Sequence, residues 1–373
     1  MKIEQPISLT MRVFPRWRYI NTMKDRLVYL DFIKAISIIL VVFCHYVIIP
    51  NESVVGNVVM LIAWAAVPCF LMCSGYILLF KTEKLRKSIS RILRTVFVMI
   101  AWKGLYYLFY YCTAGVRAQT REMIEYLFFF KSIQGINTAH FWFMNAYILC
   151  LCLVPIITPA FAQKKVDSIL WIVLMCYLPN QLLYGIQYVL NTIMPGAANS
   201  ISISGCSEVF PFSGGYSFSI PFFLLGGILR LLEDGSEKYR RNKVSVGVLL
   251  FTAGFAGLAI IKHRQCGTWR WGGAYLEAGY QWNSTVLMST GLFIILQRMS
   301  RNRIALFLAK HVGKNTMGVF YLHVPMLAWS AQYIYTMLPY AVWVNFAKTA
   351  SVIVATVLIA YGVKRIPYLR RII

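Results

Sequence analysis

Charged residues are scarce in this chain of 373 residues, at 13% of the sequence, about half of their share in an average soluble protein. Acidic side chains are the scarcest, because 13 Asp and Glu stand against 37 Lys and Arg. Hydrophobic residues make up 59% of the chain, and the mean hydropathy is +0.62. This composition excludes an ordinary soluble domain. Because apolar blocks recur along the whole length, it predicts an all-α polytopic integral membrane protein.

Two familiar sequence patterns are also missing. None of the nine cysteines forms a CxxC pair, and no zinc or other metal site is expected. Cys206 and Cys266 fall in predicted loops on one side of the membrane, and their spacing leaves a disulfide open. The first 26 residues are basic and polar, and the apolar run behind them is too long and too polar for the core of a signal peptide. No cleavable signal peptide is therefore expected.

The apolar blocks predict ten transmembrane helices, of which the sixth and the eighth are the shortest. The predicted spans are 28–48, 54–80, 92–112, 139–161, 168–194, 217–232, 244–262, 282–297, 315–337 and 341–363. They form one transmembrane domain over 28–363, between a basic N-terminal segment at 1–27 and a basic tail at 364–373.

The basic residues predict the orientation of the chain. The formal net charge of +24 would suggest nucleic acid for a soluble protein, but here the positive-inside rule explains it and no nucleic acid is expected. With the N-terminus in the cytoplasm, the inner segments are 1–27, 81–91, 162–167, 233–243, 298–314 and 364–373. The outer loops then carry only Arg117, Arg121, Lys131, Arg264 and Arg270. An odd number of spans would break this alternation, so both termini are predicted to be cytoplasmic.

The first span holds three ionisable side chains, Asp31, Lys34 and His45, where a lipid-facing helix would hold none. Lys34 and His45 are three helical turns and about 20° apart, so they point the same way at about 16 Å along the axis, and Asp31 falls on the same side. The three are candidate catalytic residues. Lys34 could hold an anionic cofactor from the cytoplasm, and His45 could act as general base on an outer hydroxyl. The alternative is that Lys34 pairs with Asp31 and that His45 is a packing residue.

Arg91 and Arg94 are expected to share one helix face on the inner side, and such a pair of guanidinium groups could bind phosphates. The alternative is an ordinary positive-inside anchor, which the sequence by itself favours.

Four further residues are candidate acceptor-binding residues: His140, Trp142, Glu277 and His323. The first three lie at the predicted outer surface, on the same side as His45, where aromatic and polar side chains suit the faces and hydroxyl groups of sugars. They suit a membrane-interface belt equally well. Trp142 could thus be an interfacial anchor, Glu277 a solvated carboxylate, and His323, inside the ninth span, a core histidine.

Four stretches of the sequence resemble the membrane-bound acyltransferase 3 family, whose members include O-acetyltransferases of bacterial surface polysaccharides. They are YLDFIKAISIILVVFCHY with its Lys-x10-His spacing, VPCFLMCSGYILLF followed by the RxxR of Arg91 and Arg94, HFWFMNAYILCLCLVP, and GKNTMGVFYLHVPML. The four run in the order found in the family and span most of the chain, and the ten predicted spans agree with it.

The resemblance implies transfer of an acyl group from cytoplasmic acyl-CoA, usually acetyl-CoA, to a hydroxyl of a cell-envelope glycan or lipid-linked sugar at the inner membrane of a bacterium. It implies that His45 is the catalytic base and that Lys34 is its basic partner. It further implies that Arg91 and Arg94 contact the CoA phosphates and that Trp142 is an aromatic near the site. Lys34 stands where many members have Arg, so a bidentate phosphate contact is not available there.

Two other functions stay open from the sequence. A transporter or exporter of a glycan or small solute would also have many spans and buried charges, although no inverted repeat is evident. A membrane-embedded sensor or scaffold is the third reading, and the short loops without a soluble domain count against it. Dependence on acyl-CoA distinguishes the acyltransferase from the transporter.

Overall fold

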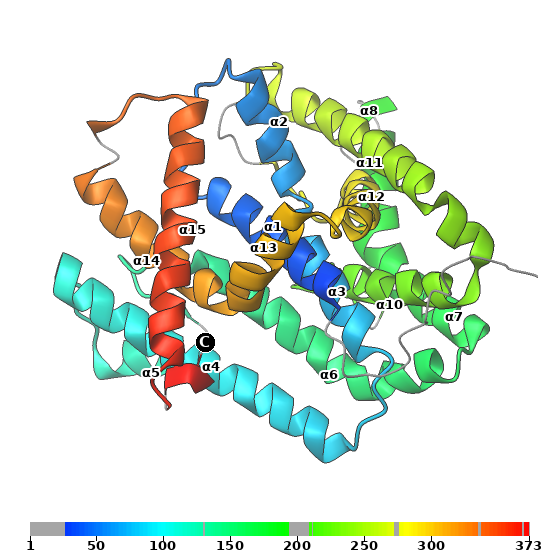
Figure 1. Cartoon of the computed structure of the whole chain (residues 1–373), viewed down its shortest axis with the longest axis horizontal. Helices are drawn as coiled ribbons and strands as arrows, with labels where there is room; N and C mark the ends of the chain where they lie inside the picture. The colour runs from blue at the N-terminus through cyan, green and yellow to red at the C-terminus, as the bar shows by residue number, and fades with distance from the viewer. Residues whose placement is uncertain are drawn as a thin grey trace, which may run out of the picture.

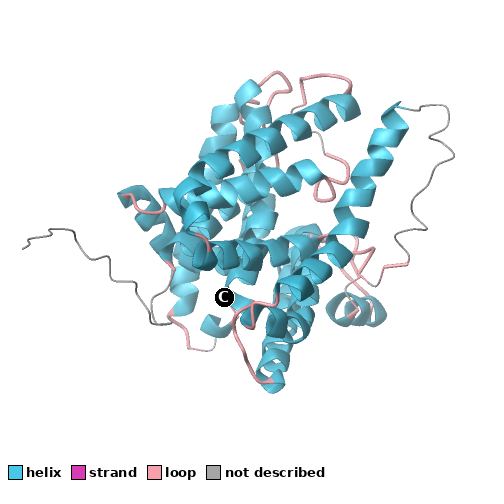
Figure 2. Cartoon of the chain, turned by 90° about the vertical axis from the view of Figure 1, so that its right-hand side faces the viewer, coloured by secondary structure: helices cyan, strands magenta, loops and turns pink. Residues whose placement is uncertain are grey.

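The computed structural model describes residues 27–129, 131–193, 209–210, 212–271, 276–334, 337–367 and 369–372. These residues form helices joined by loops, with no strand among them (Figure 1, Figure 2). The predicted all-α fold is therefore confirmed. All but the last residue of the basic segment 1–27, and also Cys206, lie outside the described residues, so pairing of Cys206 with Cys266 stays a prediction.

The elements follow one another closely along the chain. They are α1 (Val28–Phe43), α2 (Val54–Ala63), α3 (Ala66–Leu78), α4 (Leu85–Ala114), α5 (Thr120–Phe128), η1 (Ala139–Phe141), α6 (Trp142–Ala162), α7 (Val166–Tyr177), η2 (Leu178–Leu182), α8 (Leu183–Ile193), α10 (Ser219–Gly235), α11 (Glu237–Cys266), α12 (Asn283–Met299), α13 (Arg303–His311), η3 (Gly313–Asn315), α14 (Thr316–Tyr333), α15 (Val342–Lys364) and η5 (Leu369–Arg371).

Six helical segments of the described chain are long and apolar enough to cross a membrane. They are Val54–Leu78, Leu85–Ala114, Ala139–Ala162, Val166–Asn191, Glu237–Cys266 and Val342–Lys364. The other four predicted spans correspond to α1, α10, α12 and α14, which have 16, 17, 17 and 18 residues. All four are shorter than the usual transmembrane helix of about 20 residues, and all four stay predictions as membrane crossings.

Helix α1 lies inside the molecule, where it packs against α3, α12, α13, α14 and α15 (Figure 1). Leu30, Ile33, Ile38 and Val42 are fully buried, so its apolar faces contact protein rather than lipid. A helix that is apolar around most of its circumference belongs in such an interior. The polar residues of α1 are therefore enclosed by the rest of the fold.

The C-terminal end of α1 differs from the prediction. The helix was expected to continue to residue 48, but it ends at Phe43 and a turn follows, in which Tyr46 has a φ of 50°. His45 therefore lies just beyond the helix rather than on its face. The reason is a long-range contact, because side chains of α15, described below, donate hydrogen bonds to the carbonyl groups of this turn.

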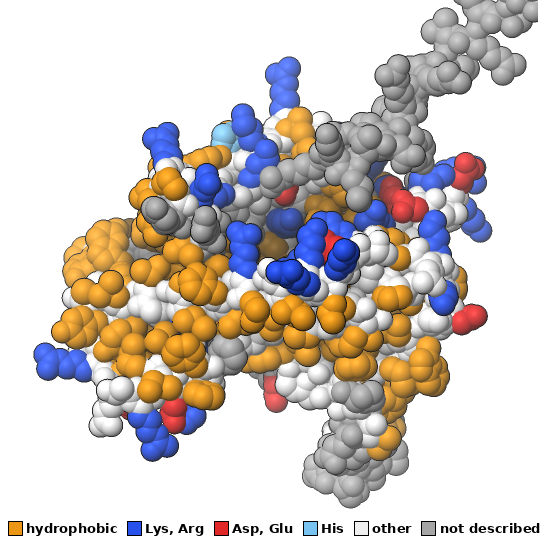
Figure 3. All heavy atoms as spheres, turned by 90° about the horizontal axis from the view of Figure 1, so that it is seen from below, with side chains coloured by type: hydrophobic (Ala, Val, Ile, Leu, Met, Phe, Trp, Pro, Cys, Tyr) orange, Lys and Arg blue, Asp and Glu red, His pale blue; other side chains and the backbone are white. Residues whose placement is uncertain are grey.

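The long helices α4 and α11 expose much of their apolar surface. In each of them only 22% of the most apolar stretch of 18 residues is buried within the protein. Apolar side chains also form a broad band on the face shown in Figure 3. This distribution suits contact with lipid, and it indicates that the long helices enclose the shorter ones.

Candidate functional site

A cavity of about 440 Å³ lies beside the first half of α1 and is lined mainly by basic and aromatic side chains. Its basic residues are Lys34, Arg91, Arg94, Lys314 and Lys364. Asp31 is the one acidic residue among the described residues that line it. Lys and Arg side chains also gather around a hollow on the face seen in Figure 3. We refer to this space as the cationic cavity, and its charge favours an anionic ligand.

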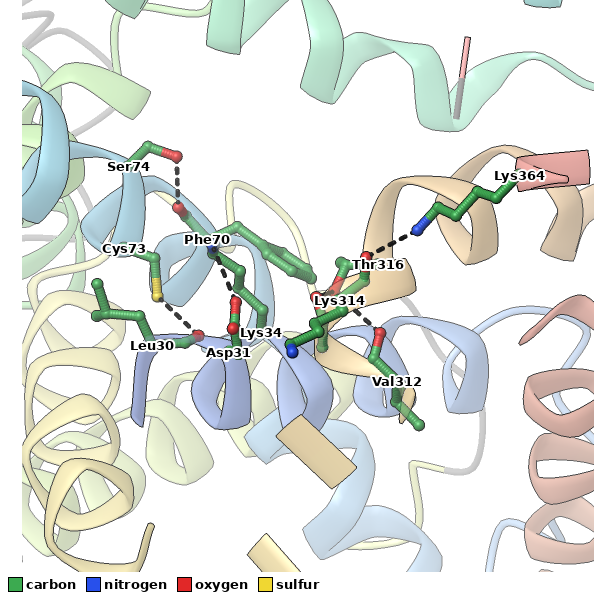
Figure 4. Close-up of polar contacts among 11 residues, drawn as sticks. Leu30, Asp31, Lys34, Phe70, Cys73, Ser74, Val312, Lys314, Thr316 and Lys364 are labelled. Carbon is green, nitrogen blue, oxygen red and sulfur yellow. Dashed lines mark hydrogen bonds and ion pairs between the residues drawn. The ribbon is translucent and has the colours of Figure 1, made fainter. Parts of the chain in front are cut away.

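Helix α1 contributes Asp31 and Lys34 to the cationic cavity (Figure 4). The Lys34 ammonium lies 3.8 Å from a carboxylate oxygen of Asp31, one turn earlier on the helix. Asp31 is buried, whereas the Lys34 side chain remains 27% exposed. The ion pair between Lys34 and Asp31, which was expected as an alternative, is therefore present, but Lys34 still lines the cavity. The carboxylate restrains the ammonium while leaving it accessible to an anion.

Helix α4 contributes Arg91 and Arg94 to the cationic cavity. The helix already begins at Leu85, so the two arginines lie on it three residues apart and on one face, as predicted. Arg91 also donates a hydrogen bond to the carboxylate of Glu83, which precedes the helix. Arg91 is partly buried and Arg94 is exposed, and both side chains line the cavity.

The last two cations of the cavity come from the C-terminal part of the chain (Figure 4). At Gly313, a Cβ atom would lie 2.0 Å from the backbone oxygen of Asp31, so only glycine allows η3 to approach α1 this closely. This approach brings the next residue, Lys314, to the cavity. Lys364 at the end of α15 donates to the Lys314 carbonyl oxygen at 3.0 Å and to the Asn315 side-chain oxygen at 2.6 Å, which ties α15 to the same wall.

A second cavity, of about 590 Å³, lies beyond the other end of α1. Its lining includes His45 and five aromatic side chains, which are Trp64, Trp142, Tyr216, Phe218 and Tyr280. We refer to it as the aromatic cavity. The two cavities are close neighbours, because Trp142 lines the aromatic cavity and the next residue, Phe143, lines the cationic one.

The imidazole of His45 is oriented by the last turn of α1. Its Nδ1 lies 2.5 Å from the carbonyl oxygen of Val41. A carbonyl only accepts hydrogen bonds, so Nδ1 carries the proton and Nε2 is the basic nitrogen of the neutral ring. This tautomer is the one that a general base needs, because Nε2 is left to accept a proton from a hydroxyl group.

Two further histidines lie against His45 and form a cluster with it. The ring of His323 is 5.1 Å from the ring of His45 and 5.3 Å from the ring of His140. The Nδ1 of His323 donates to the carbonyl oxygen of Phe320 at 2.7 Å, and its buried Nε2 has no hydrogen-bond partner among the described residues. His323 therefore packs beside His45, and its functional role stays a prediction.

His140 is held by a chain of hydrogen bonds. The hydroxyl of Tyr106 donates to the carbonyl oxygen of Tyr321 at 2.7 Å, so it accepts from Nε2 of His140 at 3.1 Å. The Nδ1 of His140 is then unprotonated, and it too is buried with no hydrogen-bond partner in the part of the chain that the structure describes. Among the described residues, no group of three or more His, Cys, Asp or Glu side chains is placed to hold a metal ion.

Helix α15 fixes the turn that carries His45. The Lys348 ammonium donates to the carbonyl oxygens of His45 and Tyr46 at 2.7 and 2.8 Å. Asn345, one turn earlier, donates to the carbonyl oxygen of Phe43 at 3.0 Å and accepts from the backbone N–H of Ile48 at 3.1 Å. We refer to Asn345 and Lys348 as the α15 clamp. It satisfies carbonyl groups left open by the early end of α1.

The structure groups most of the predicted site residues and leaves one apart. Glu277 is exposed, and its side chain lines neither cavity, although residues 278–281 line the aromatic one. Its role in acceptor binding stays a prediction. The sequence reasoning missed the α15 clamp and Lys314, and for Lys348 a signal existed, since a lysine inside an apolar helix is a functional candidate by default.

The sequence model of one protein family, described as an acyltransferase domain, matches residues 27–365, which is nearly the whole chain. No curated protein and no solved structure matches the chain.

Proposed function

The chain belongs to the acyltransferase 3 family, and we propose that this membrane acyltransferase moves an acetyl group from acetyl-CoA to a hydroxyl of a cell-envelope glycan or lipid-linked sugar. The observation that carries this proposal is the pair of cavities at the two ends of α1. One cavity is cationic and suits the phosphates of CoA. The other is aromatic and holds the candidate base His45.

The donor occupies the cationic cavity. Arg91 and Arg94 contact its phosphates with planar guanidinium groups, while Lys34 and Lys314 add point charges. The thioester then points toward Phe143 and the histidine cluster. Phe143 and Trp142 are consecutive and line different cavities, so the acetyl group passes from one cavity to the other near these two residues.

The acceptor hydroxyl meets the acetyl group at His45. Nε2 of His45 takes the hydroxyl proton as the oxygen attacks the thioester carbon, because a neutral hydroxyl is a weak nucleophile. The tetrahedral intermediate collapses, the carbon–sulfur bond breaks, and the proton passes from His45 to the departing CoA thiolate. His323 lies beside His45 and supports its position during this exchange.

We place the cationic cavity on the cytoplasmic side and the aromatic cavity on the outer side of a bacterial inner membrane. The basic inner segments support this orientation through the positive-inside rule. In this arrangement the six long segments and the shorter α1, α10, α12 and α14 make up ten crossings, and both termini are cytoplasmic.

Purified protein in lipid nanodiscs with radiolabelled acetyl-CoA tests the proposal. We expect His45→Ala to retain CoA binding and to lose transfer of label to extracted envelope glycans. The double variant Arg91→Ala/Arg94→Ala is expected to weaken CoA binding. Arg86→Ala is the matched control, because Arg86 is exposed on the same helix and does not line the cavity.

A folded wild-type protein that binds no CoA would overturn the proposal and favour transport of a glycan or solute. If His45→Ala binds CoA and still transfers the label fully, the acyltransferase proposal holds but His45 is not its base.

A further inference from the structure

We propose that the aromatic cavity selects an uncharged sugar ring as the acceptor, with one ring face against the aromatic side chains and a hydroxyl at His45. This inference rests on the proposed function, which names only a glycan or lipid-linked sugar. It adds the charge class of the sugar residue and the side chains that recognise it.

The charge of the cavity is the first observation. Among the described residues that line it, none is Asp, Glu, Lys or Arg. The neighbouring cationic cavity is lined by five basic residues. The lack of charged side chains in the described lining of the aromatic cavity is therefore not a consequence of the low charge of the whole chain. The Lys348 ammonium lies behind the His45 carbonyl oxygen and is not part of the lining. A carboxylate or phosphate on the acceptor would lose its hydration here without gaining a cation.

The arrangement of the rings is the second observation. Phe218 and Tyr280 are stacked, with centroids 5.6 Å apart and planes 3° apart. Trp142 lies 5.2 Å from Tyr280, and Trp64 meets Tyr280 edge-on at 4.9 Å. Gln281 adds an amide to this apolar wall. An apolar lining with a few placed polar groups is typical of small-molecule sites, and it matches the apolar face and the hydroxyl rim of a pyranose.

The wall is built rigidly from a strained segment. Ala278 has a φ of 50°, a backbone conformation that side chains other than glycine rarely adopt. At Gly279, a Cβ atom would lie 2.3 Å from the Trp64 ring, so glycine is required for that ring to sit where it does. The Thr285 hydroxyl donates to the Gly279 carbonyl oxygen at 2.5 Å, and the Trp282 indole donates to that of Glu277 at 2.9 Å. These contacts hold the segment that carries Tyr280 against the Trp64 ring.

The size of the cavity agrees with this assignment. Its volume of about 590 Å³ falls within the range of small-molecule sites, about 300–1,000 Å³. An aromatic wall would also attract a quaternary ammonium group through cation–π contacts. No carboxylate lines the described part of the cavity to complete such a cage, so the neutral sugar is favoured.

The test uses octyl hexosides of gluco, galacto and manno configuration, the matching octyl hexuronides, and choline, each with radiolabelled acetyl-CoA and the full-length protein in nanodiscs. Acetylation and quenching of tryptophan fluorescence are both recorded. We expect at least one neutral hexoside to be acetylated and to quench fluorescence, and its hexuronide to do neither. A hexuronide or choline used as well as the best hexoside overturns the inference, and so does a complete lack of response to every hexoside.

Variants connect the result to the cavity. We expect Trp142→Ala and Gly279→Ala each to lower kcat/KM for the hexoside by about tenfold or more, with unchanged acetyl-CoA binding. Trp171→Ala is the control, because Trp171 is exposed on α7. Gln281→Lys adds a cation and should raise the preference for hexuronide over hexoside by about tenfold. Retained acetyl-CoA binding with no sugar response refutes this inference alone, whereas lost acetyl-CoA binding refutes the proposed function.

Discussion

Replacement of Lys348 by Met tests whether the α15 clamp positions His45, the proposed catalytic base. Methionine keeps the length and the apolar stem of lysine but donates no hydrogen bond. Three oxygen atoms lose a hydrogen bond from the Lys348 ammonium. They are the carbonyl oxygens of His45 and Tyr46, at 2.7 and 2.8 Å, and the side-chain oxygen of Asn345, at 2.8 Å. Lys348 is only 2% exposed, so little water is present to replace these bonds.

The expected change in the free energy of unfolding is the sum of two opposing contributions. Each hydrogen bond to a charged group contributes about 1.5–3 kcal/mol, and the orphaned carbonyl oxygens carry a desolvation penalty. Burial of the ammonium itself costs free energy, which the substitution recovers in part. We therefore expect Lys348→Met to lower the free energy of unfolding by about 2–4 kcal/mol. Release of the turn displaces His45, and a displacement of about 1 Å can lower kcat about 100-fold.

The assay is acetyl transfer at saturating donor and acceptor, together with a melting curve of the protein in nanodiscs. We expect a low kcat and an unchanged KM for acetyl-CoA, since the clamp is not part of the cationic cavity. Lys310→Met is the control, because Lys310 is exposed on α13. If Lys348→Met does not fold, Asn345→Ala still removes the contacts to Phe43 and Ile48. A well-folded variant of either kind with the wild-type kcat would refute the positioning role.

Three further predictions concern the rest of the site. Lys314→Ala should weaken acetyl-CoA binding several-fold and reduce its salt dependence, as measured by titration calorimetry at two ionic strengths, and an unchanged affinity would remove Lys314 from donor binding. Burial raises the pKa of Glu83, but the hydrogen bond from Arg91 and nearby cations outweigh it, so the pKa lies below its usual value. This pairing stabilises the protein above the ordinary carboxyl pKa and is lost as the pH falls through the lowered one. Melting curves at pH 7 and pH 4 should therefore show a larger loss for wild type than for Glu83→Gln. Tyr106→Phe frees His140 from its hydroxyl partner and should lower kcat more than it lowers the melting temperature, and the opposite pattern would assign Tyr106 to stability alone.

Part of the site could be predicted from periodicity along single helices. The spacing of Asp31 and Lys34 places both on one face, and the structure shows them together in one cavity. The same holds for Arg91 and Arg94 on α4. Helical spacing determines which residues share a face, because that relation depends on neighbours in the sequence.

Other parts of the site depend on contacts that no local pattern reveals. Lys348 reaches the His45 carbonyl oxygen from a position 303 residues later in the chain. That contact ends α1 early, and the expected position of His45 on the helix face was therefore wrong. Gly313 likewise allows η3 to approach α1 closely, which brings Lys314 to the cavity. The spacing of residues in the sequence does not predict this approach.

Helix α1 is one of the four predicted spans that are not among the six long segments, and its short length fits its position in the molecule. Its 16 residues make a helix of about 24 Å, less than the hydrocarbon thickness of about 30 Å. A lipid-facing helix of this length would leave backbone groups unsatisfied in hydrocarbon, but α1 is enclosed by other helices. The length rule therefore applies to the outer segments, such as α4 and α11, and not to α1. In the proposed function, this short enclosed helix would connect a donor in the cationic cavity with an acceptor in the aromatic cavity.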